Sequence, residues 1–320
     1  MEHIMKNLLN RLFNHEILSK EEAKNTLINI SNGTYNQNQI ASFLTVYMMR
    51  SIHVDELSGF REALLELCIK VDLSDYNTFN ISTLAAFVTA GAGIKVAKHG
   101  NYGVSSISGS STVMEKIGVQ FSNKPHYLKK CVDQAGICIL HAPLFHPAMK
   151  NVAPIRKELG VKTFFNIVGP MVNPSFPKNQ LVGVYSLELA RIYAYLYQNT
   201  AVNYNIVHSL DGYDEISLTY STKSISKNSE IIFSAVDLGI SKTNQIDIMG
   251  GKNINESAQI FMKILSGKGT EAQNNVVCAN AGMAISTINN TSLIKGFELA
   301  KESLLSGKGL TALEKLKKVI

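Results

Sequence analysis

The sequence predicts an α/β protein with an N-terminal helical lobe and a larger lobe that holds a mostly parallel sheet flanked by helices. In the first part of the chain, apolar side chains such as Leu8 and Leu12 recur at helical spacing. Further along, the strand-like segments 181–185 and 205–208 enclose a helical segment, 187–196. This βαβ pattern is typical of parallel sheets, because parallel neighbours need a crossover connection. A chain of 320 residues, 45% of them hydrophobic and 18% charged, can bury a core of this size.

The N-terminal lobe contains recognisable helix boundaries. Ser19 and Glu22 form the pattern of a capping box that opens a helix, and Asn32-Gly33 predicts the end of the same helix. We expect the helical lobe to span residues 1–72, joined by about 145–172, and the α/β lobe to span 73–144 and 173–320. From the residues alone, the apolar stripe of the helical lobe fits an internal core and a subunit interface equally well.

Composition excludes several classes of protein. The longest apolar run, Leu84 to Ile94, is far shorter than the roughly 20 residues of a membrane helix, and the first residues form no secretion signal, so we expect a cytoplasmic protein without membrane contact. The four cysteines are scattered, which favours reduced packing residues over disulfides or a zinc site. The net charge of +6 comes from dispersed lysines, which fits anionic small substrates and makes nucleic acid an unexpected partner.

The most informative segment is 79–111. Asn80, Ser82 and Thr83 precede the apolar residues 84–88, a pattern that predicts a helix N-terminus able to receive an anion. A short buried strand, 94–96, then opens into a loop where ligands of α/β sheets collect. That loop contains Lys98, His99, Gly100 and Asn101. Small residues that suit a phosphate cradle, or form only a polar turn, follow at Ser105, Ser106, Ser108, Gly109 and Ser110.

The rest of the chain continues the α/β pattern. We expect helices over 112–117, 124–136 and 256–265, a buried strand over 137–140, and one helix from His146 to Leu159. That last helix carries Arg156, which by itself fits a solvated surface position. Asp214 and Glu215 are adjacent in a turn, where two carboxylates are usually only solvated.

Taken together, several motifs resemble those of the anthranilate phosphoribosyltransferases. They lie in that family's order over nearly the whole chain: Phe79–Thr83, Val96–Asn101, His146–Met149, Arg156–Gly160, Phe165–Pro170, Asp211–Ser217 and Asn280–Gly282. The resemblance implies transfer of 5-phosphoribose from 5-phosphoribosyl 1-pyrophosphate (PRPP) to the amino group of anthranilate, with release of pyrophosphate, in tryptophan biosynthesis. It also implies a homodimer formed through the helical lobe.

The resemblance further implies roles for individual residues. Magnesium would be held near Ser82, Asp214 and Glu215, whose hard oxygen atoms suit that ion. Anthranilate would meet Asn101, His146 and Arg156, since a guanidinium fits a carboxylate bidentately. No covalent nucleophile is implied. The donor PRPP would be bound by Asn80, Ser82, Thr83, Lys98, His99, Gly100, Asn101, Ser105, Ser106, Ser108, Gly109 and Ser110.

The chain departs from the family pattern shortly before Phe79. Relatives have there a strand and a Gly-Thr-Gly-Gly-Asp loop that holds the pyrophosphate, whereas this chain has no glycine between Gly59 and Gly91. We therefore predict that about a dozen residues are deleted, a strand as well as a loop, and that activity is impaired. A second departure is Tyr102, which stands where many relatives have an arginine.

Two alternatives remain at this stage. A pyrimidine nucleoside phosphorylase would share the fold, although the Lys98–Asn101 and His146–Arg156 motifs fit the transferase better. A non-catalytic descendant that binds nucleic acid or a partner through a basic surface is favoured by the lost loop, while retention of Lys98, Arg156 and the acidic pair counts against it.

Overall fold

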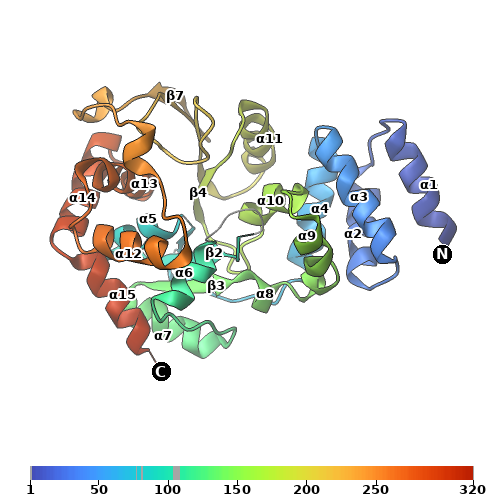
Figure 1. Ribbon diagram of the computed structural model, residues 1–320, viewed down its shortest axis with the longest axis horizontal. Coiled ribbons are helices and arrows are strands. Elements are labelled where there is room, and N and C mark those ends of the chain that lie inside the picture. Colours follow the sequence, from blue (N-terminus) through green and yellow to red (C-terminus); the bar gives the residue numbers. More distant parts are fainter. Residues whose placement is uncertain (1, 77, 81, 104–108, 320) are drawn as a thin grey trace.

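The structure is a computed structural model that describes residues 2–76, 78–80, 82–103 and 109–319. Figure 1 shows the N-terminal helices at one end of the molecule and the sheet with its helices at the other. The N-terminus lies at the far end of the helical part, and the C-terminus lies beside α7 (Pro125–Ala135). The predicted α/β class, with its N-terminal helices and larger sheet-containing part, is confirmed. Within the described residues, no helix combines the length and apolar character needed to cross a membrane.

The N-terminal part is built from α1 (Glu2–Phe13), α2 (Lys20–Ser31), α3 (Gln37–Met49) and α4 (Val54–Leu67). The predicted capping box opens α2: Ser19 Oγ accepts from Glu22 N at 3.2 Å, and Glu22 Oε2 accepts from Ser19 N at 2.9 Å. Helix α2 stops at Ser31 with Asn32 as its C-cap, as predicted. Local side-chain chemistry thus accounts for both ends of this helix.

Segments from the middle of the chain pack onto these helices: η2 (Pro147–Asn151), α9 (Ala153–Leu159) and α10 (Phe164–Val168). The short α8 (Ala142–Phe145) precedes them in the chain, and η3 (Gly169–Met171) follows them. The ring of Phe164 stacks on Phe60 with centroids 4.4 Å apart. The same apolar cluster continues through Val182 and Tyr193 into the sheet-containing part. Because one core joins the two parts, it marks no boundary between them, and the lobe bounds given above stay a prediction.

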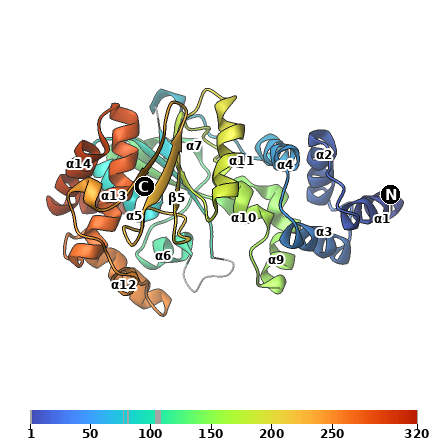
Figure 2. The same cartoon turned by 90° about the horizontal axis from the view of Figure 1, so that it is seen from above.

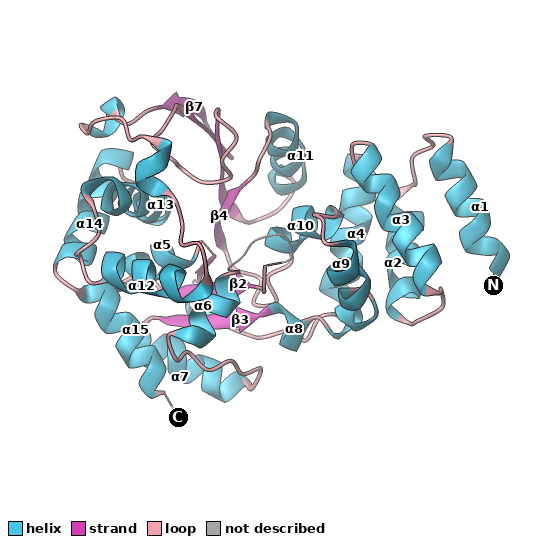
Figure 3. Cartoon of the chain, viewed as in Figure 1, coloured by secondary structure: helices cyan, strands magenta, loops and turns pink. Residues whose placement is uncertain are grey.

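The sheet has seven strands in the order β3-β2-β1-β4-β5-β6-β7. The first five are parallel, which confirms the parallel sheet, and the last two are antiparallel. Figure 3 shows the strands between two groups of helices. The strand bounds are β1 Phe79–Asn80, β2 Val96–Gly100, β3 Ile137–His141, β4 Asn179–Gly183, β5 Asn203–Ser209, β6 Thr222–Ser226 and β7 Glu230–Phe233.

Alternating side chains bury both faces of the central strands. Val182 and Ile206 belong to the apolar cluster that includes α11 (Leu187–Gln198), whereas Leu181 and Val207 belong to the cluster that includes α13 (Glu271–Asn289). Figure 2 shows α11 and α13 on opposite sides of β5. Burial on both faces is the usual state of parallel strands.

Most of the remaining helices lie on the face of the sheet that α13 covers. Helix α5 (Thr83–Gly91) packs against α13 and against the C-terminal helix α15 (Lys308–Lys318). The other helical segments are α6 (Ser110–Lys116), α7, α12 (Ile254–Leu265), α14 (Leu293–Leu305), η1 (Ser74–Tyr76), η4 (Val236–Leu238) and η5 (Gln245–Ile248). All four cysteines are buried and free.

Two predicted elements are wrong. Lys98, His99 and Gly100 were expected in a loop, but they continue β2, because His99 and Gly100 pair with Leu140 and His141 of β3. The expected single helix from His146 to Leu159 is divided into η2 and α9. Each begins near a proline, a residue that lacks an N–H group and is tolerated only in the first turn of a helix.

The prediction that a strand is missing before Phe79 needs correction. The sheet has no gap there, because Phe79 pairs with both Val96 of β2 and Asn179 of β4, and Asn80 pairs with Gln180. Asn80 was predicted at a helix N-terminus but belongs to this two-residue strand. The short β1 therefore takes the central position of the sheet, and only residues 81 and 82 separate it from α5.

Candidate active site

Three adjoining cavities lie where β1, β2, β4 and β5 end. The serine cavity, about 240 Å³, is lined by Ser82, Thr83, Gly109 and Ser110 among others. The middle cavity, about 320 Å³, shares Ser82 and Glu215 with it. The wide cavity, about 650 Å³, shares Arg156 and His99 with the middle cavity. The shared walls make one continuous cleft at the carboxyl edge of the sheet, the place where α/β proteins bind ligands.

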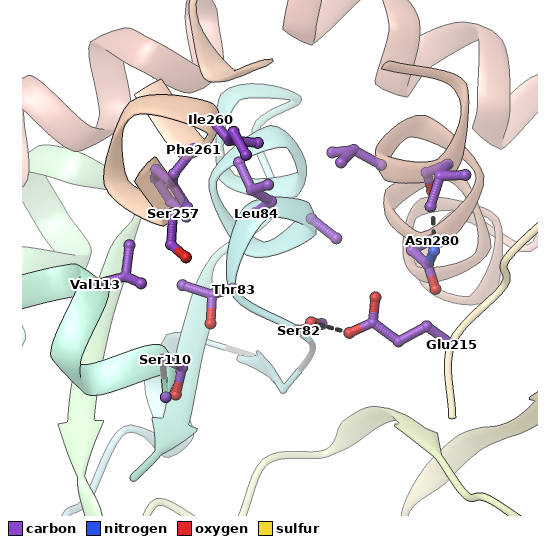
Figure 4. Close-up of a pocket in the computed structure, with 14 residues that line it drawn as sticks. Ser82, Thr83, Leu84, Ser110, Val113, Glu215, Ser257, Ile260, Phe261 and Asn280 are labelled. Atoms are coloured by element: carbon purple, nitrogen blue, oxygen red, sulfur yellow. Dashed lines mark hydrogen bonds between the residues drawn. The ribbon is translucent and has the colours of Figure 1, made fainter. Parts of the chain in front are cut away.

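Hydroxyl groups from three helices meet at the serine cavity. Figure 4 shows Thr83 of α5, Ser110 of α6 and Ser257 of α12 on one side of the cavity, and the Ser82–Glu215 hydrogen bond on the other. Ser82 is the N-cap of α5 and makes no side-chain bond to its own helix. The first N–H groups of α5 and the surrounding hydroxyls can therefore act as donors to an anion.

The two predicted acidic residues line the middle cavity together with Lys98. Enclosure by protein groups raises the pKa of Glu215, and neighbouring Asp214 adds to this shift, while Ser82 and Lys98 oppose it. The Glu215 side chain still reaches solvent through the cleft. Burial lowers the pKa of Lys98 to about 8, against the attraction of Glu215. A cation and two carboxylates thus face the same space.

Three residues that were not predicted as site residues hold the acidic turn in place. Gly183 ends β4, and a Cβ there would lie 1.4 Å from the Asp214 carbonyl oxygen. Ser209 Oγ donates to the carbonyl of Glu215 at 2.7 Å. Asn280 of α13 clamps the next residue, with bonds of 3.0 Å from Ile216 N and 2.9 Å to Ile216 O. Asn280 had a sequence signal, since it lies in a family motif, whereas Gly183 and Ser209 had none.

Arg156 of α9 is a buried cation at the wall between the middle and wide cavities, 7% exposed. One guanidinium nitrogen donates to Asn166 Oδ1 at 3.0 Å, and the group lies over the Phe165 ring at 5.2 Å. Its Nε is buried without a hydrogen bond, and no carboxylate of the described residues pairs with it. Burial lowers the pKa of Arg156 to about 10. The guanidinium is therefore suited to an anionic ligand in the cleft.

Two histidines, His99 and His146, line the wide cavity beside Arg156. The centroids of their rings lie 5.2 Å apart, and His146 Nε2 contacts the Val172 carbonyl oxygen at 3.1 Å. Burial lowers the pKa of His146 to about 4 and that of His99 well below its ordinary value, with neighbouring His146 adding to the shift of His99. Both rings are therefore neutral near pH 7, and neither competes with Arg156 as a cation.

The structure brings most of the predicted residues to this cleft. Lys98, Gly100 and Asn101 line the middle cavity, and Asn101, His99, His146 and Arg156 line the wide cavity. Asn80 lies in β1, at the edge of the sheet where the cavities meet. Ser105, Ser106 and Ser108 lie outside the described residues.

Comparison with known proteins first gives the broad class, the glycosyl transferase family. The description "Glycosyl transferase family, helical bundle domain" matches residues 6–68, and "Glycosyl transferase family, a/b domain" matches residues 74–310. An anthranilate phosphoribosyltransferase from Flavobacterium psychrophilum is 72% identical over 328 residues, covering 98% of this chain and 99% of the relative. The chain therefore belongs to the anthranilate phosphoribosyltransferase family, a group of glycosyl transferase enzymes, which confirms the predicted family.

Solved structures extend the similarity to the fold. The crystal structure of anthranilate phosphoribosyltransferase from Thermus thermophilus superposes with a TM-score of 0.87 at 28% identity, covering 97% of this chain and 98% of that one. The Saccharomyces cerevisiae enzyme in complex with PRPP and Mg gives a TM-score of 0.86 at 26% identity, covering 99% and 97%.

The match to the Flavobacterium relative also bears on the predicted deletion. Its 328 aligned positions exceed the 320 residues of this chain, so the relative has residues with no counterpart here. This agrees with a deletion in this chain, and its place between Lys70 and Phe79 stays a prediction.

Proposed function

We propose that this chain transfers 5-phosphoribose from PRPP to the amino group of anthranilate, giving N-(5-phosphoribosyl)anthranilate and pyrophosphate in tryptophan biosynthesis, with turnover limited by the missing glycine-rich loop. Arg156 is the observation that supports it most. A buried guanidinium without an acidic partner among the described residues, beside an apolar ring and a cavity, suits an aromatic carboxylate. The middle cavity joins that position to the donor residues.

The donor side is proposed to use the N-terminus of α5, Lys98 and the hydroxyls of the serine cavity. Negative charge develops on the leaving pyrophosphate, so N–H dipoles and a cation aimed at it lower the barrier. The nitrogen of anthranilate forms its bond to the sugar carbon as the bond from that carbon to the pyrophosphate oxygen breaks, and the amine loses a proton. The protein holds both reactants in place and forms no covalent intermediate.

Magnesium is proposed to bind at Ser82, Asp214 and Glu215. The donor set fits, because hard oxygen atoms are present, and a bound cation would offset the burial and the neighbouring Asp214 charge that raise the pKa of Glu215. Among the described residues no group of three or more acidic, histidine or cysteine side chains could hold a metal, so two carboxylates need donor phosphates to complete the site. When bound, the ion would neutralise phosphate charge.

Calorimetry tests this proposal. The chain should bind PRPP with Mg²⁺ and, separately, anthranilate, and it should consume anthranilate slowly when both are present. Asp214→Asn combined with Glu215→Gln should abolish magnesium-dependent PRPP binding and leave anthranilate binding unchanged. Magnesium dependence that persists in the double variant would place the ion elsewhere.

A second function is favoured by the direct connection from β1 to α5, which has no glycine-rich turn. In this case the chain would bind both ligands without turnover and would serve as a binding protein. Full-length enzyme incubated with PRPP, Mg²⁺ and anthranilate would then form no product even at high concentration. Salt-dependent binding to single-stranded DNA would favour the descendant that uses its basic surface.

We also propose a cytoplasmic homodimer formed through a helical lobe of residues 1–72 and about 145–172. The proposal is supported by large apolar side chains that lie on the outside of α1 and α3, Phe13 at 58% and Met49 at 82% exposure. Unpartnered apolar groups of this kind often mark an interface. Sedimentation should give a dimer for the chain and a monomer for Phe13→Asp with Met49→Asp.

A further inference from the structure

The residues on either side of the segment that joins β2 to α6 contact each other, and we call residues 100–103 and 109–111 its base. Ser111 N and Ser110 Oγ both donate to the Asn101 carbonyl oxygen at 3.2 Å. A Cβ on Gly109 would lie 1.8 Å from Gly103 N, so the two backbones touch and only glycine fits there. The two ends of the segment therefore meet before α6 begins.

His141 lies against this base. It is the last residue of β3, it pairs in register with Gly100, and its side chain is buried, with the residue 5% exposed. Its Nδ1 shares a 2.9 Å hydrogen bond with Ser111 Oγ at one end of the segment. At the other end, the Tyr102 ring meets the imidazole edge to face, with centroids 4.6 Å apart.

Further contacts fix the imidazole itself. The Phe121 ring stacks on it at 4.5 Å with an interplanar angle of 15°. Burial lowers the pKa of His141, so the ring is neutral near pH 7 and the hydrogen bond to Ser111 needs no counter-charge. Tyr102 Oη also donates to Glu115 Oε1 of α6 at 2.7 Å, a second link between the two ends.

We propose that His141 is a positioning residue that holds Tyr102 and Ser111 together. It thereby fixes the base, which consists of residues 100–103 and 109–111. The expected effect on PRPP binding rests on the proposed function. The base supplies walls to all three cavities, since Gly109 and Ser110 line the serine cavity, while Asn101 and Tyr102 line both the middle and the wide cavity. A shift of the base would move polar groups that face all of these cavities, and binding sites depend on such supporting contacts.

Two variants each remove one partner of the hydrogen bond between Ser111 and His141. His141→Phe keeps a flat ring between Tyr102 and Phe121, and Ser111→Ala keeps the backbone bond to Asn101. Ser303→Ala is a matched control, because Ser303 is also 1% exposed and its hydroxyl also makes one buried hydrogen bond, to the Val88 carbonyl at 2.7 Å, in a different part of the molecule.

Hydrogen exchange on the unliganded full chain should show faster exchange of the Tyr102 and Ser111 amides in both variants and not in the control. Calorimetry should show PRPP with Mg²⁺ bound about threefold to tenfold more weakly, as expected for one lost hydrogen bond. Anthranilate affinity should fall less, because Asn101 belongs to the base whereas His146 and Arg156 come from other elements. Because the two variants delete the same bond, their combination should cost little more than either alone.

Unchanged amide exchange together with unchanged PRPP affinity would overturn the proposal, and so would an equal loss of PRPP affinity in Ser303→Ala. If the wild-type chain binds no PRPP but the exchange difference persists, His141 still fixes the base, and it is the proposed function that fails.

Discussion

Two enclosed cations, Arg156 and Lys98, are the most telling residues of this molecule. Both have a lowered pKa because burial disfavours their charge. Burying a charged group without a full ion pair costs free energy, so folding alone would favour an acidic partner or an apolar residue at these positions. Their position in the walls of one continuous cleft suits the anionic ligands of the proposed function.

Arg156→Ala should weaken anthranilate binding by about 1.5–3 kcal/mol, the usual range for a hydrogen bond to a charged group. Arg156→Lys keeps the charge but loses the planar fork, so its affinity should fall between those of the wild type and the alanine variant. Titration calorimetry with anthranilate measures both. Wild-type affinity in the alanine variant would remove Arg156 from the acceptor site.

Lys98 should make donor binding depend on pH. Its charge is lost as the pH rises through about 8, so PRPP affinity should fall across that range, whereas Lys98→Arg should bind equally well at pH 7 and 9. The free energy of unfolding should change in the opposite direction. Since the pKa of Lys98 is about 8 when folded and ordinarily 10.5, the unfolded chain binds more protons between these values and the folded state gains stability as the pH rises. Donor affinity that stays flat in the wild type would contradict this role.

At the scale of elements, the acidic turn depends on contacts from three separate places. Strand β4 supplies Gly183, β5 supplies Ser209, and α13 supplies Asn280. None of these three residues needs to touch a ligand to affect binding. They determine where the Asp214 and Glu215 carboxylates lie relative to Ser82 and Lys98, and such positioning governs both metal binding and reactivity.

Gly183→Ala should therefore weaken magnesium-dependent PRPP binding by about tenfold to a hundredfold, because the new Cβ forces the Asp214 backbone away from β4. Gly250→Ala is the control, since a Cβ there meets nothing within 4 Å. Calorimetry with PRPP and Mg²⁺ compares the two. Equal affinity in both variants would show that the turn is not held by this contact.

At the scale of the whole molecule, the weak point is the centre of the sheet. The two-residue β1 joins the β3-β2 pair to the rest of the sheet, and it leads into α5 with no glycine-rich turn. Part of the pyrophosphate cradle of the family is therefore absent, although the helix end, Lys98 and the acidic pair are present. We expect the missing loop to lower both stability and catalysis.

Insertion before Phe79 of a longer strand, to take the place of the two-residue β1, and of a Gly-Thr-Gly-Gly-Asp loop should raise both the melting temperature and the turnover of PRPP and anthranilate. One restored donor to a developing anion lowers a barrier by about 3–4 kcal/mol, and the loop would supply several. Thermal unfolding and steady-state assays on the two chains measure the effects. If the present chain is already as fast as the repaired one, the loop is not required.

Local patterns in the sequence determined much of this protein. The capping residues around Ser19 and Asn32 account for α2, short apolar segments account for β4 and β5, and contiguous motifs identified the family and most residues of the cleft. These features are readable because each depends on residues that are close together in the chain.

Only the tertiary structure decided which residues support the site. The pairing of Phe79 with two strands, the contact of Gly183 with Asp214 and the bond between Ser111 and His141 join residues that are distant in sequence. Such contacts depend on strand register and on the close approach of backbones, and neither leaves a local pattern of apolar or capping residues. A glycine at the end of a strand looks the same in the sequence whether it faces solvent or, like Gly183, allows the acidic turn to pack against it.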